Sequence, residues 1–157
     1  MSVELSPIIA GVMNWGVWDK NLNTNEFTHL INLFIENGIT TFDHADIYGG
    51  YTTEASFGKA LSESKIDRKK IQLITKCGIQ YVSENRPNNS IKHYEYSKDY
   101  IIWSAENSLK NLQTDYLDVF LLHRPSPLMQ ADEIAEAVSK LKADGKILSF
   151  GVSNFTS

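Results

Sequence analysis

The sequence predicts an α/β fold in which helices cover a parallel sheet, and three observations carry this prediction. Short, continuous apolar runs alternate along the chain with longer amphipathic segments. The apolar runs lack the polar alternation of half-exposed strands, so they fit strands that are buried on both faces. No proline-rich or glycine-rich linker divides the pattern, so all 157 residues are expected to belong to one domain.

The expected elements alternate regularly. Strands are expected at residues 7–12, 40–42, 71–76, 117–123 and 147–153. Helices are expected at residues 25–37, 53–62, 97–113 and 131–144. The apolar stripe of the third helix is expected to consist of Ile102, Ala105, Leu109 and Leu112. Asn23 or Thr24 can cap the first helix, Ser97 can cap the third, and residues 80–97 form a long polar loop.

Two architectures satisfy this order of elements. One is an open, doubly wound sheet; the other is the first five strands and four helices of an eight-stranded (β/α)8 barrel. A doubly wound nucleotide-binding sheet should carry G-x-G-x-x-G after its first strand, and none of the nine glycines gives this spacing. The barrel is therefore favoured. Because a complete barrel takes about 250 residues, residues 1–157 are expected to be the N-terminal part of one barrel domain.

Composition argues against several classes of function. The formal net charge is −4, from 15 basic and 19 acidic residues without a basic run, so no nucleic-acid partner is expected. No apolar run approaches the roughly 20 residues of a membrane helix, and the start of the chain lacks a signal-peptide pattern. Cys77 is the single cysteine, so a disulfide is not expected and the reducing cytoplasm is the expected location.

Four polar side chains lie at or just after the carboxyl ends of three expected strands. Asp43 and Tyr48 follow the second strand, Lys76 ends the third, and His123 ends the fourth. Singly, each has a structural explanation as a cap, a packed ring or a solvated charge. In a parallel barrel, however, these strand ends share the face that holds the active site. The sequence therefore predicts that the four side chains meet in one pocket.

This set of side chains suits the reduction of a carbonyl group. A tyrosine with its reference pKa near ~10 is a poor acid at neutral pH, and a nearby ammonium such as Lys76 is expected to lower that pKa. Asp43 would supply the counter-charge to Lys76. His123 would orient the substrate oxygen or pass a proton to Tyr48. Since no side chain donates hydride, a nicotinamide cofactor is implied.

Four motifs, in order and with matching spacing, resemble those of the aldo-keto reductase family. FDHADIYGGYTTEASFGKAL resembles the family signature between its second strand and second helix, and ITKCG resembles the lysine-bearing third strand. DVFLLHRP and FGVSNF resemble the fourth and fifth strands. HADIYGGY is most similar to the bacterial oxidoreductase branch. The resemblance extends from Ile8 to Phe155.

The resemblance implies roles for particular residues. The implied catalytic tetrad is Asp43, Tyr48, Lys76 and His123, with Tyr48 as the general acid. The implied cofactor is NADPH, and the residues that would contact it are Gly11, Val12, Met13, Asp43, Ser153 and Asn154. The implied substrate is a small-molecule aldehyde or ketone that contacts Tyr48 and His123.

Three further residues near the expected pocket have two interpretations each. The resemblance places a substrate-pocket residue at Trp15, whereas the alternative is that Trp15 packs over the barrel. For Trp18 the packing interpretation is favoured. Arg124 either edges the substrate pocket or faces solvent.

Other functions remain open at this point. One is a non-catalytic, cofactor-sensing partner subunit; another is a metal enzyme using Asp43, His44 and His123, which is the less favoured. The remaining strands of the family's barrel carry the aromatic ring that stacks on the nicotinamide and the loop that grips the 2′-phosphate. The isolated chain is therefore expected to have little or no activity. Its open sheet edge is expected to favour self-association.

Overall fold

The main sheet has five parallel strands in the order β1-β2-β3-β6-β7, in a computed structural model that describes residues 3–156. The strands are β1 (Ile9–Gly11), β2 (Thr41–Asp43), β3 (Gln72–Cys77), β6 (Leu117–Leu122) and β7 (Ile147–Val152). Spatial order in this sheet follows chain order, whereas a doubly wound sheet reverses direction at a switch point. The predicted α/β class is confirmed, and the arrangement is that of part of a (β/α)8 barrel.

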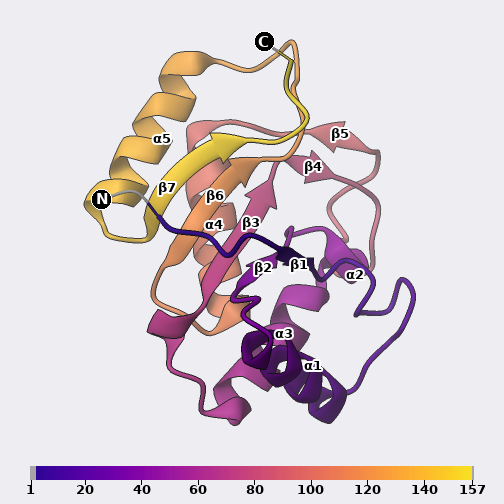
Figure 1. Cartoon of the computed structure of the whole chain (residues 1–157). Coiled ribbons are helices and arrows are strands. Elements are labelled where there is room, and N and C mark those ends of the chain that lie inside the picture. Colours follow the sequence, from indigo (N-terminus) through magenta and orange to yellow (C-terminus); the bar gives the residue numbers. More distant parts are fainter. Residues whose placement is uncertain (1–2, 157) are drawn as a thin grey trace.

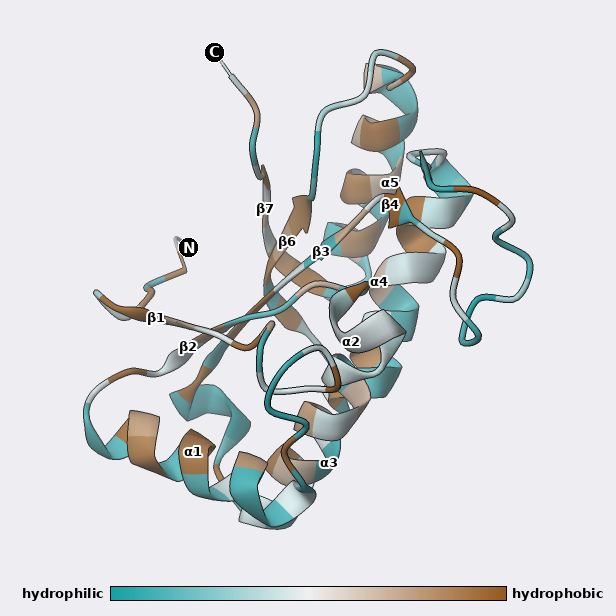
Figure 2. Ribbon diagram, turned by 90° about the vertical axis from the view of Figure 1, so that its right-hand side faces the viewer, coloured by the Kyte–Doolittle hydropathy of each residue, from teal (hydrophilic) through white to brown (hydrophobic). Residues whose placement is uncertain are grey.

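Four long helices connect the strands. They are α1 (Thr24–Glu36), α3 (Thr53–Ser64), α4 (Lys98–Leu112) and α5 (Ala131–Ala143), with a 3₁₀ turn at Arg68–Lys70. Each helix packs on its neighbour in the series, and the helices lie on one side of the sheet (Figures 1 and 2). Within residues 3–156, no helix covers the opposite side of the sheet.

Local sequence explains where the helices begin. The Asn23 side chain accepts hydrogen bonds from the backbone at Asn25 and Glu26, and the Glu26 carboxylate accepts from the Asn23 N–H at 2.8 Å. This capping box starts α1. The Ser97 hydroxyl accepts from the Tyr100 N–H and starts α4, as predicted.

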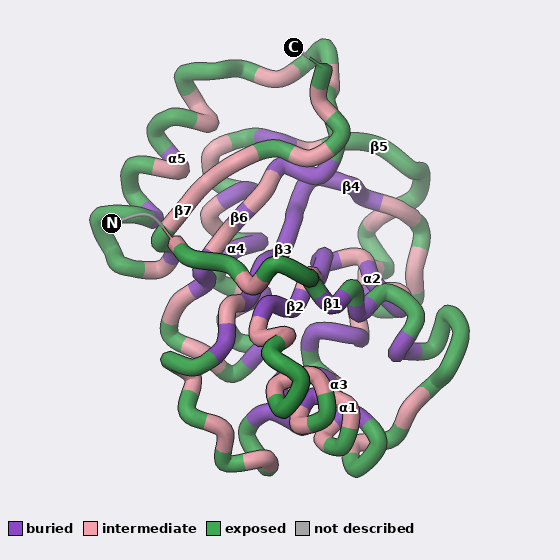
Figure 3. Tube along the Cα trace, viewed as in Figure 1, coloured by how far each residue is buried: buried purple, intermediate pink, exposed green. Residues whose placement is uncertain are grey.

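The core lies between the sheet and the helices (Figure 3). Among its fully buried side chains are Phe27, Ile31, Phe42, Phe57, Leu73, Ile101, Phe120 and Leu141. Helices α3 and α4 meet at Gly58, where a Cβ would lie 2.1 Å from the Asn111 carbonyl oxygen. Only glycine permits this approach of the two helices.

The buried face of α4 differs from the predicted stripe. Ile101, Ser104, Ala105, Ser108 and Leu112 are the buried residues of this helix. Ile102 and Leu109 are only partly buried. The predicted stripe was therefore rotated by about one residue, because two serines take core positions that apolar periodicity does not reveal.

The segment expected to be a long polar loop contains a small antiparallel hairpin. Strand β4 (Ile79–Gln80) pairs with β5 (His93–Tyr94), and we call residues 79–94 the hairpin. The Asn89 side chain donates to Gln80 Oε1 at 2.7 Å and to the Tyr81 carbonyl at 3.2 Å, which braces the connection. Strands of two residues are too short for periodicity to predict.

An apolar groove runs between α5 and the outer face of β7. It has a volume of about 510 Å³, and its lining includes Ile134, Val138 and Phe150. Val152 of β7 also lines the groove and is 48% exposed, and Leu148 of the same strand is 49% exposed. Among the described helices, none is long and apolar enough to cross a membrane.

Candidate active site

Parallel pairing brings the predicted site residues to one edge of the sheet. Asp43 is the last residue of β2, Lys76 is near the end of β3, and His123 follows β6 directly. The ladder continues past the strand ends, since the His44 N–H donates to the Ile74 carbonyl at 2.8 Å and the His123 N–H to the Cys77 carbonyl at 2.9 Å. The strand ends, with the polar side chains that they carry, therefore lie next to one another.

Lys76 is the centre of the cluster. Its Nζ donates to Asp43 Oδ2 at 2.7 Å, to the His44 carbonyl at 2.7 Å and to the Tyr48 hydroxyl at 3.4 Å. The three N–H groups of the ammonium thus have three acceptors. Burial lowers the pKa of Lys76, and the Asp43 carboxylate opposes this shift. Lys76 and Tyr48 are buried, whereas the Asp43 side chain is 27% exposed.

His123 completes the cluster from the neighbouring strand. Its ring centroid lies 6.2 Å from that of Tyr48, with the two rings nearly perpendicular. Burial lowers the pKa of His123 to about 4, and the positive charges of Lys76 and Arg124 add to the shift. His123 is therefore neutral at pH 7 and can both donate and accept a hydrogen bond.

The expected lowering of the Tyr48 pKa is wrong. Burial raises the pKa of Tyr48 to about 12, and the negative charge of Asp43 raises it further. The physical reason is that Lys76 lies closer to Asp43 than to Tyr48, so its charge is largely balanced by the carboxylate. Tyr48 is therefore fully protonated at neutral pH. It can still protonate an alkoxide, which is a stronger base than a phenolate.

The two tryptophans lie in different places from those that the resemblance gave Trp15 and the packing interpretation gave Trp18. Trp15 is buried among phenylalanines, with ring centroids 5.6 Å from Phe27 and 5.7 Å from Phe34. Trp18 is 46% exposed, and its ring lies 6.2 Å from that of Tyr48. The backbone turns back after β1, since the Trp15 N–H donates to the Val12 carbonyl, and this turn places Trp15 in the core. Trp18 is therefore the tryptophan beside the tetrad.

The residues expected to contact a cofactor lie on either side of the tetrad, at the ends of the two outer strands, β1 and β7. At the end of β1, a Cβ on Gly11 would meet no atom within 4 Å, and Met13 is 44% exposed. Val12 is fully buried, and only its N–H reaches this edge, where it donates to the Asp43 carbonyl at 3.1 Å. Gly11 and Met13 thus leave room for a bound molecule, whereas the Val12 side chain belongs to the core.

At the end of β7, Ser153 and Asn154 lie close to His123. The Asn154 Nδ2 donates to the His123 carbonyl at 3.2 Å and to Ser153 Oγ at 2.8 Å. A hydroxyl beside an amide offers both donors and acceptors, which is the set that a carboxamide group needs. Ser153 and Asn154 therefore fit the carboxamide of a nicotinamide. Arg124, by contrast, is exposed.

Two buried acids lie behind Lys76. Asp46 accepts from the Tyr100 hydroxyl at 3.2 Å and from the Ser104 hydroxyl at 3.3 Å, and Glu54 accepts from the Thr75 hydroxyl at 2.6 Å. Burial raises the pKa of Asp46 to about 8, and the charge of Glu54 adds to the shift. Burial also raises the pKa of Glu54.

A metal centre is not favoured by the geometry. Within residues 3–156, no three His, Cys, Asp or Glu side chains are grouped in a way that could hold a metal ion. The His44 ring is fully buried and packs edge-on against Phe57, with ring centroids 4.4 Å apart. His29 and His93 are exposed.

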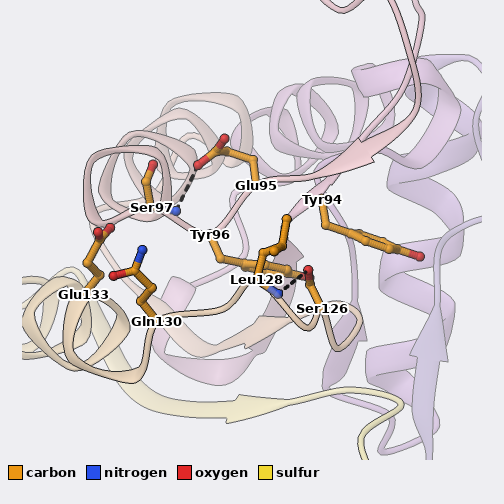
Figure 4. Close-up of a pocket in the computed structure, with 8 residues that line it drawn as sticks. All are labelled: Tyr94, Glu95, Tyr96, Ser97, Ser126, Leu128, Gln130 and Glu133. Atoms are coloured by element: carbon orange, nitrogen blue, oxygen red, sulfur yellow. Dashed lines mark hydrogen bonds between the residues drawn. The ribbon is translucent and has the colours of Figure 1, made fainter.

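A separate cavity of about 210 Å³ lies between the start of α4 and the connection from β6 to α5 (Figure 4). Tyr94, Tyr96, Leu128 and Glu133 are among the residues that line it, and no tetrad residue does. Its carboxylates already accept backbone hydrogen bonds, from Ser97 to Glu95 at 2.9 Å and from Lys98 to Glu133 at 3.0 Å. The tetrad is thus not part of this cavity.

Comparison with known proteins identifies the family. The model of the aldo/keto reductase family matches residues 7–157. The chain belongs to the aldo-keto reductase family. Uncharacterized oxidoreductase YcsN of Bacillus subtilis (strain 168) is 50% identical over 153 residues, which are 98% of this chain and 50% of YcsN. The 6-dehydroglucose reductase of Agrobacterium fabrum is 40% identical over 98% of this chain and 51% of its own length.

Solved structures agree with this assignment. The aldo-keto reductase AKR11C1 from Bacillus halodurans, in its holo form, matches with a TM-score of 0.80 and 30% identity. The match covers 96% of this chain and 47% of that protein. This aldo-keto reductase chain thus spans about half the length of the relatives it matches. The family assignment and the resemblance to bacterial oxidoreductases are confirmed.

Proposed function

We propose that this chain carries the catalytic tetrad of an NADPH-dependent oxidoreductase that reduces aldehydes or ketones, with Tyr48 as the general acid. The observation that carries the proposal is the position of the Lys76 ammonium, which is bound to Asp43 at 2.7 Å and to the Tyr48 hydroxyl at 3.4 Å. Because Lys76 only donates, the hydrogen of the Tyr48 hydroxyl is free to be given to a substrate oxygen.

The chain's own residues divide the chemistry among them. Neutral His123 orients the carbonyl oxygen, Asp43 holds Lys76, and Lys76 holds Tyr48. Gly11, Met13, Ser153 and Asn154 bind the nicotinamide portion of the cofactor. The bound cofactor supplies the hydride that no side chain can give, and the Tyr48 proton neutralises the oxygen charge that then develops. The choice of NADPH over NADH follows from the family resemblance.

Residues 1–157 are proposed to be the N-terminal part of one barrel domain, and the isolated chain to be weakly active or inactive. The relative at 40% identity is a 6-dehydroglucose reductase, so sugar-derived carbonyl compounds are the first substrates to assay. The intact tetrad favours an enzyme over a non-catalytic partner subunit. The single, buried Cys77 is in keeping with a cytoplasmic location.

Replacement of Tyr48 by Phe in the natural gene product tests the proposal. The intact mass of that product is measured first, to establish its length. Loss of a general acid typically costs about 10²–10⁴-fold in turnover, and we expect NADPH affinity to be retained because the ring remains. Phe150→Tyr is a matched control, since Phe150 lies on β7 in the apolar groove. Turnover by Tyr48→Phe at the wild-type rate would remove Tyr48 from its assigned role.

A further inference from the structure

The segment that carries Tyr48 has an unusual backbone. The element α2 (Tyr48–Tyr51) is helical only in its hydrogen bonding, because Gly49 and Gly50 have φ values of 60° and 67°. Tyr51 continues the left-handed run with a φ of 71°. We call Gly49–Tyr51 the left-handed turn. A left-handed conformation is unfavourable for a residue with a side chain and persists only where neighbouring groups hold it.

The hairpin supplies side-chain hydrogen bonds to the left-handed turn, in addition to the local bond from Thr52 Oγ1 to the Gly49 carbonyl at 2.6 Å. The Gly50 carbonyl accepts from Asn85 Nδ2 at 2.9 Å and from Ser83 Oγ at 3.3 Å. The Ile47 carbonyl, just before Tyr48, accepts from the Tyr81 hydroxyl at 3.3 Å. Each of these three donors is a side chain of the hairpin, so a segment more than 30 residues away in the chain contributes to holding the turn.

Ring stacking attaches the hairpin to the same turn. The Tyr51 and Tyr81 rings are stacked, with centroids 5.1 Å apart and planes 17° apart. The Tyr51 hydroxyl accepts from the Tyr81 N–H at 3.1 Å. The Arg86 guanidinium lies 4.7 Å from the Tyr51 ring centroid and 4.3 Å from that of Trp103 on α4. Arg86 thus fixes the turn between the hairpin and a rigid helix.

The left-handed turn determines where the Tyr48 hydroxyl lies. Tyr48 is the residue directly before it, and the Tyr48 carbonyl accepts the Thr52 N–H across the turn at 3.2 Å. If the turn relaxed to a right-handed path, the Tyr48 side chain would leave its position beside Lys76, where the contact of 3.4 Å is already long.

We propose that the hairpin is a clamp, in which Asn85, Tyr81 and Arg86 are positioning residues that hold the left-handed turn and so fix the Tyr48 hydroxyl beside Lys76. The inference rests on the function proposed for Tyr48. None of these positioning residues touches the tetrad ammonium or its carboxylate. They act through the backbone of the segment that carries the acid, and the hairpin is therefore part of the catalytic apparatus and not only a surface loop.

The test compares two asparagines of one hairpin. Asn85→Ala removes the amide that donates to Gly50, and Asn88→Ala is the control, since Asn88 is exposed and makes none of the described contacts with the turn. In the natural gene product, Asn85→Ala should lower kcat by about tenfold to a hundredfold, as misplacement of a reacting group does, with KM for NADPH unchanged. Asn88→Ala should leave both constants unchanged.

Ring-¹³C tyrosine NMR provides a readout that does not depend on turnover. The Tyr48 signal is assigned by its absence in Tyr48→Phe. We expect it to move in Asn85→Ala and in Arg86→Met, which removes the guanidinium between two rings, and to stay in place in Asn88→Ala. Retained turnover in Tyr48→Phe together with a moved signal would reject the function proposed for Tyr48 and keep the clamp.

The clamp is overturned by either of two results. One is that Asn85→Ala and Arg86→Met match Asn88→Ala in kcat and in the Tyr48 signal. The other is that both variants lower the thermal midpoint while the Tyr48 signal and kcat stay at their wild-type values, which would show that the hairpin contributes only to stability.

Discussion

The Tyr48 hydroxyl accepts a hydrogen bond of 3.4 Å from the Lys76 ammonium. A lysine can only donate, so the phenolic hydrogen of Tyr48 points away from Lys76 and is free to be donated elsewhere. With its pKa raised to about 12 by burial and by Asp43, Tyr48 keeps its proton until a strong base appears. The alkoxide oxygen that would develop when hydride adds to a carbonyl carbon is such a base.

Asp46 makes the stability of the chain depend on pH. Its pKa is raised from 3.8 to about 8, so the folded state holds a proton that the unfolded state releases, and stability falls as pH rises through this range. Below about pH 6.5 the lowered pKa values of His44 and His123 act in the opposite direction. Asp46 therefore dominates between about pH 6.5 and about 8.

We expect the free energy of unfolding to fall between these pH values by at most about 1.4 kcal/mol per pH unit. Asp46→Asn, which keeps the acceptor for Tyr100, should remove most of this slope. Urea unfolding at several pH values measures it. Asp115→Asn, at an exposed aspartate, is the control. Equal slopes in the wild type and Asp46→Asn would contradict the assignment.

Trp15 and Trp18 should respond differently to the same substitution. Trp15→Ala empties a core site between aromatic rings and should lower stability by about 3–5 kcal/mol. Trp18→Ala should change stability by less than about 1 kcal/mol but raise KM for the carbonyl substrate several-fold, because the ring lies beside Tyr48. Urea unfolding and steady-state kinetics measure the two effects. A raised KM for Trp15→Ala alone would restore the role that the resemblance gave to Trp15.

Cofactor binding by the isolated chain should be weak. Titration of NADPH against tryptophan fluorescence should give shallow quenching without saturation, because the family's grip on the adenosine 2′-phosphate comes from later strands. The natural gene product, if longer, is the comparison. Tight, saturable quenching by residues 1–157 alone would show that this chain holds the cofactor by itself.

The free edge at β7 should make the isolated chain associate with itself. Leu148 and Val152 are about half exposed there, and Val152 lines the apolar groove along α5. A double variant, Leu148→Lys with Val152→Lys, should reduce association, since charged side chains discourage edge-to-edge pairing. Leu128→Lys, at an 85% exposed leucine away from the sheet, is the control. Light scattering at rising concentration measures the mass. A monomeric wild type would refute the prediction.

Much of the fold could be predicted because the spacing of apolar residues along the chain indicates which positions are buried. Continuous apolar runs and amphipathic stripes gave five strands and four helices within a few residues of their observed bounds. The position of Lys76 beside Asp43 and Tyr48 followed from a rule of topology, since parallel strands present their carboxyl ends at one edge.

The features that the sequence did not reveal depend on tertiary distances. The direction of the Tyr48 pKa shift depends on how Lys76 divides its charge between two partners. The placement of Trp15 and Trp18 depends on a backbone turn after β1. Tyr51 has a left-handed conformation although it is not a glycine, so the sequence does not indicate it. Stacking on Tyr81 holds this conformation.

The order of strands in the main sheet has a consequence for how the chain is made. Each strand of this sheet after β1 pairs with the sheet strand that was synthesised before it. Synthesis can therefore extend the sheet one unit at a time, with no gap kept open for a later insertion. A new parallel strand could join beside β7 without breaking any existing pair, and Tyr48, Lys76 and His123 could already be assembled when it arrived.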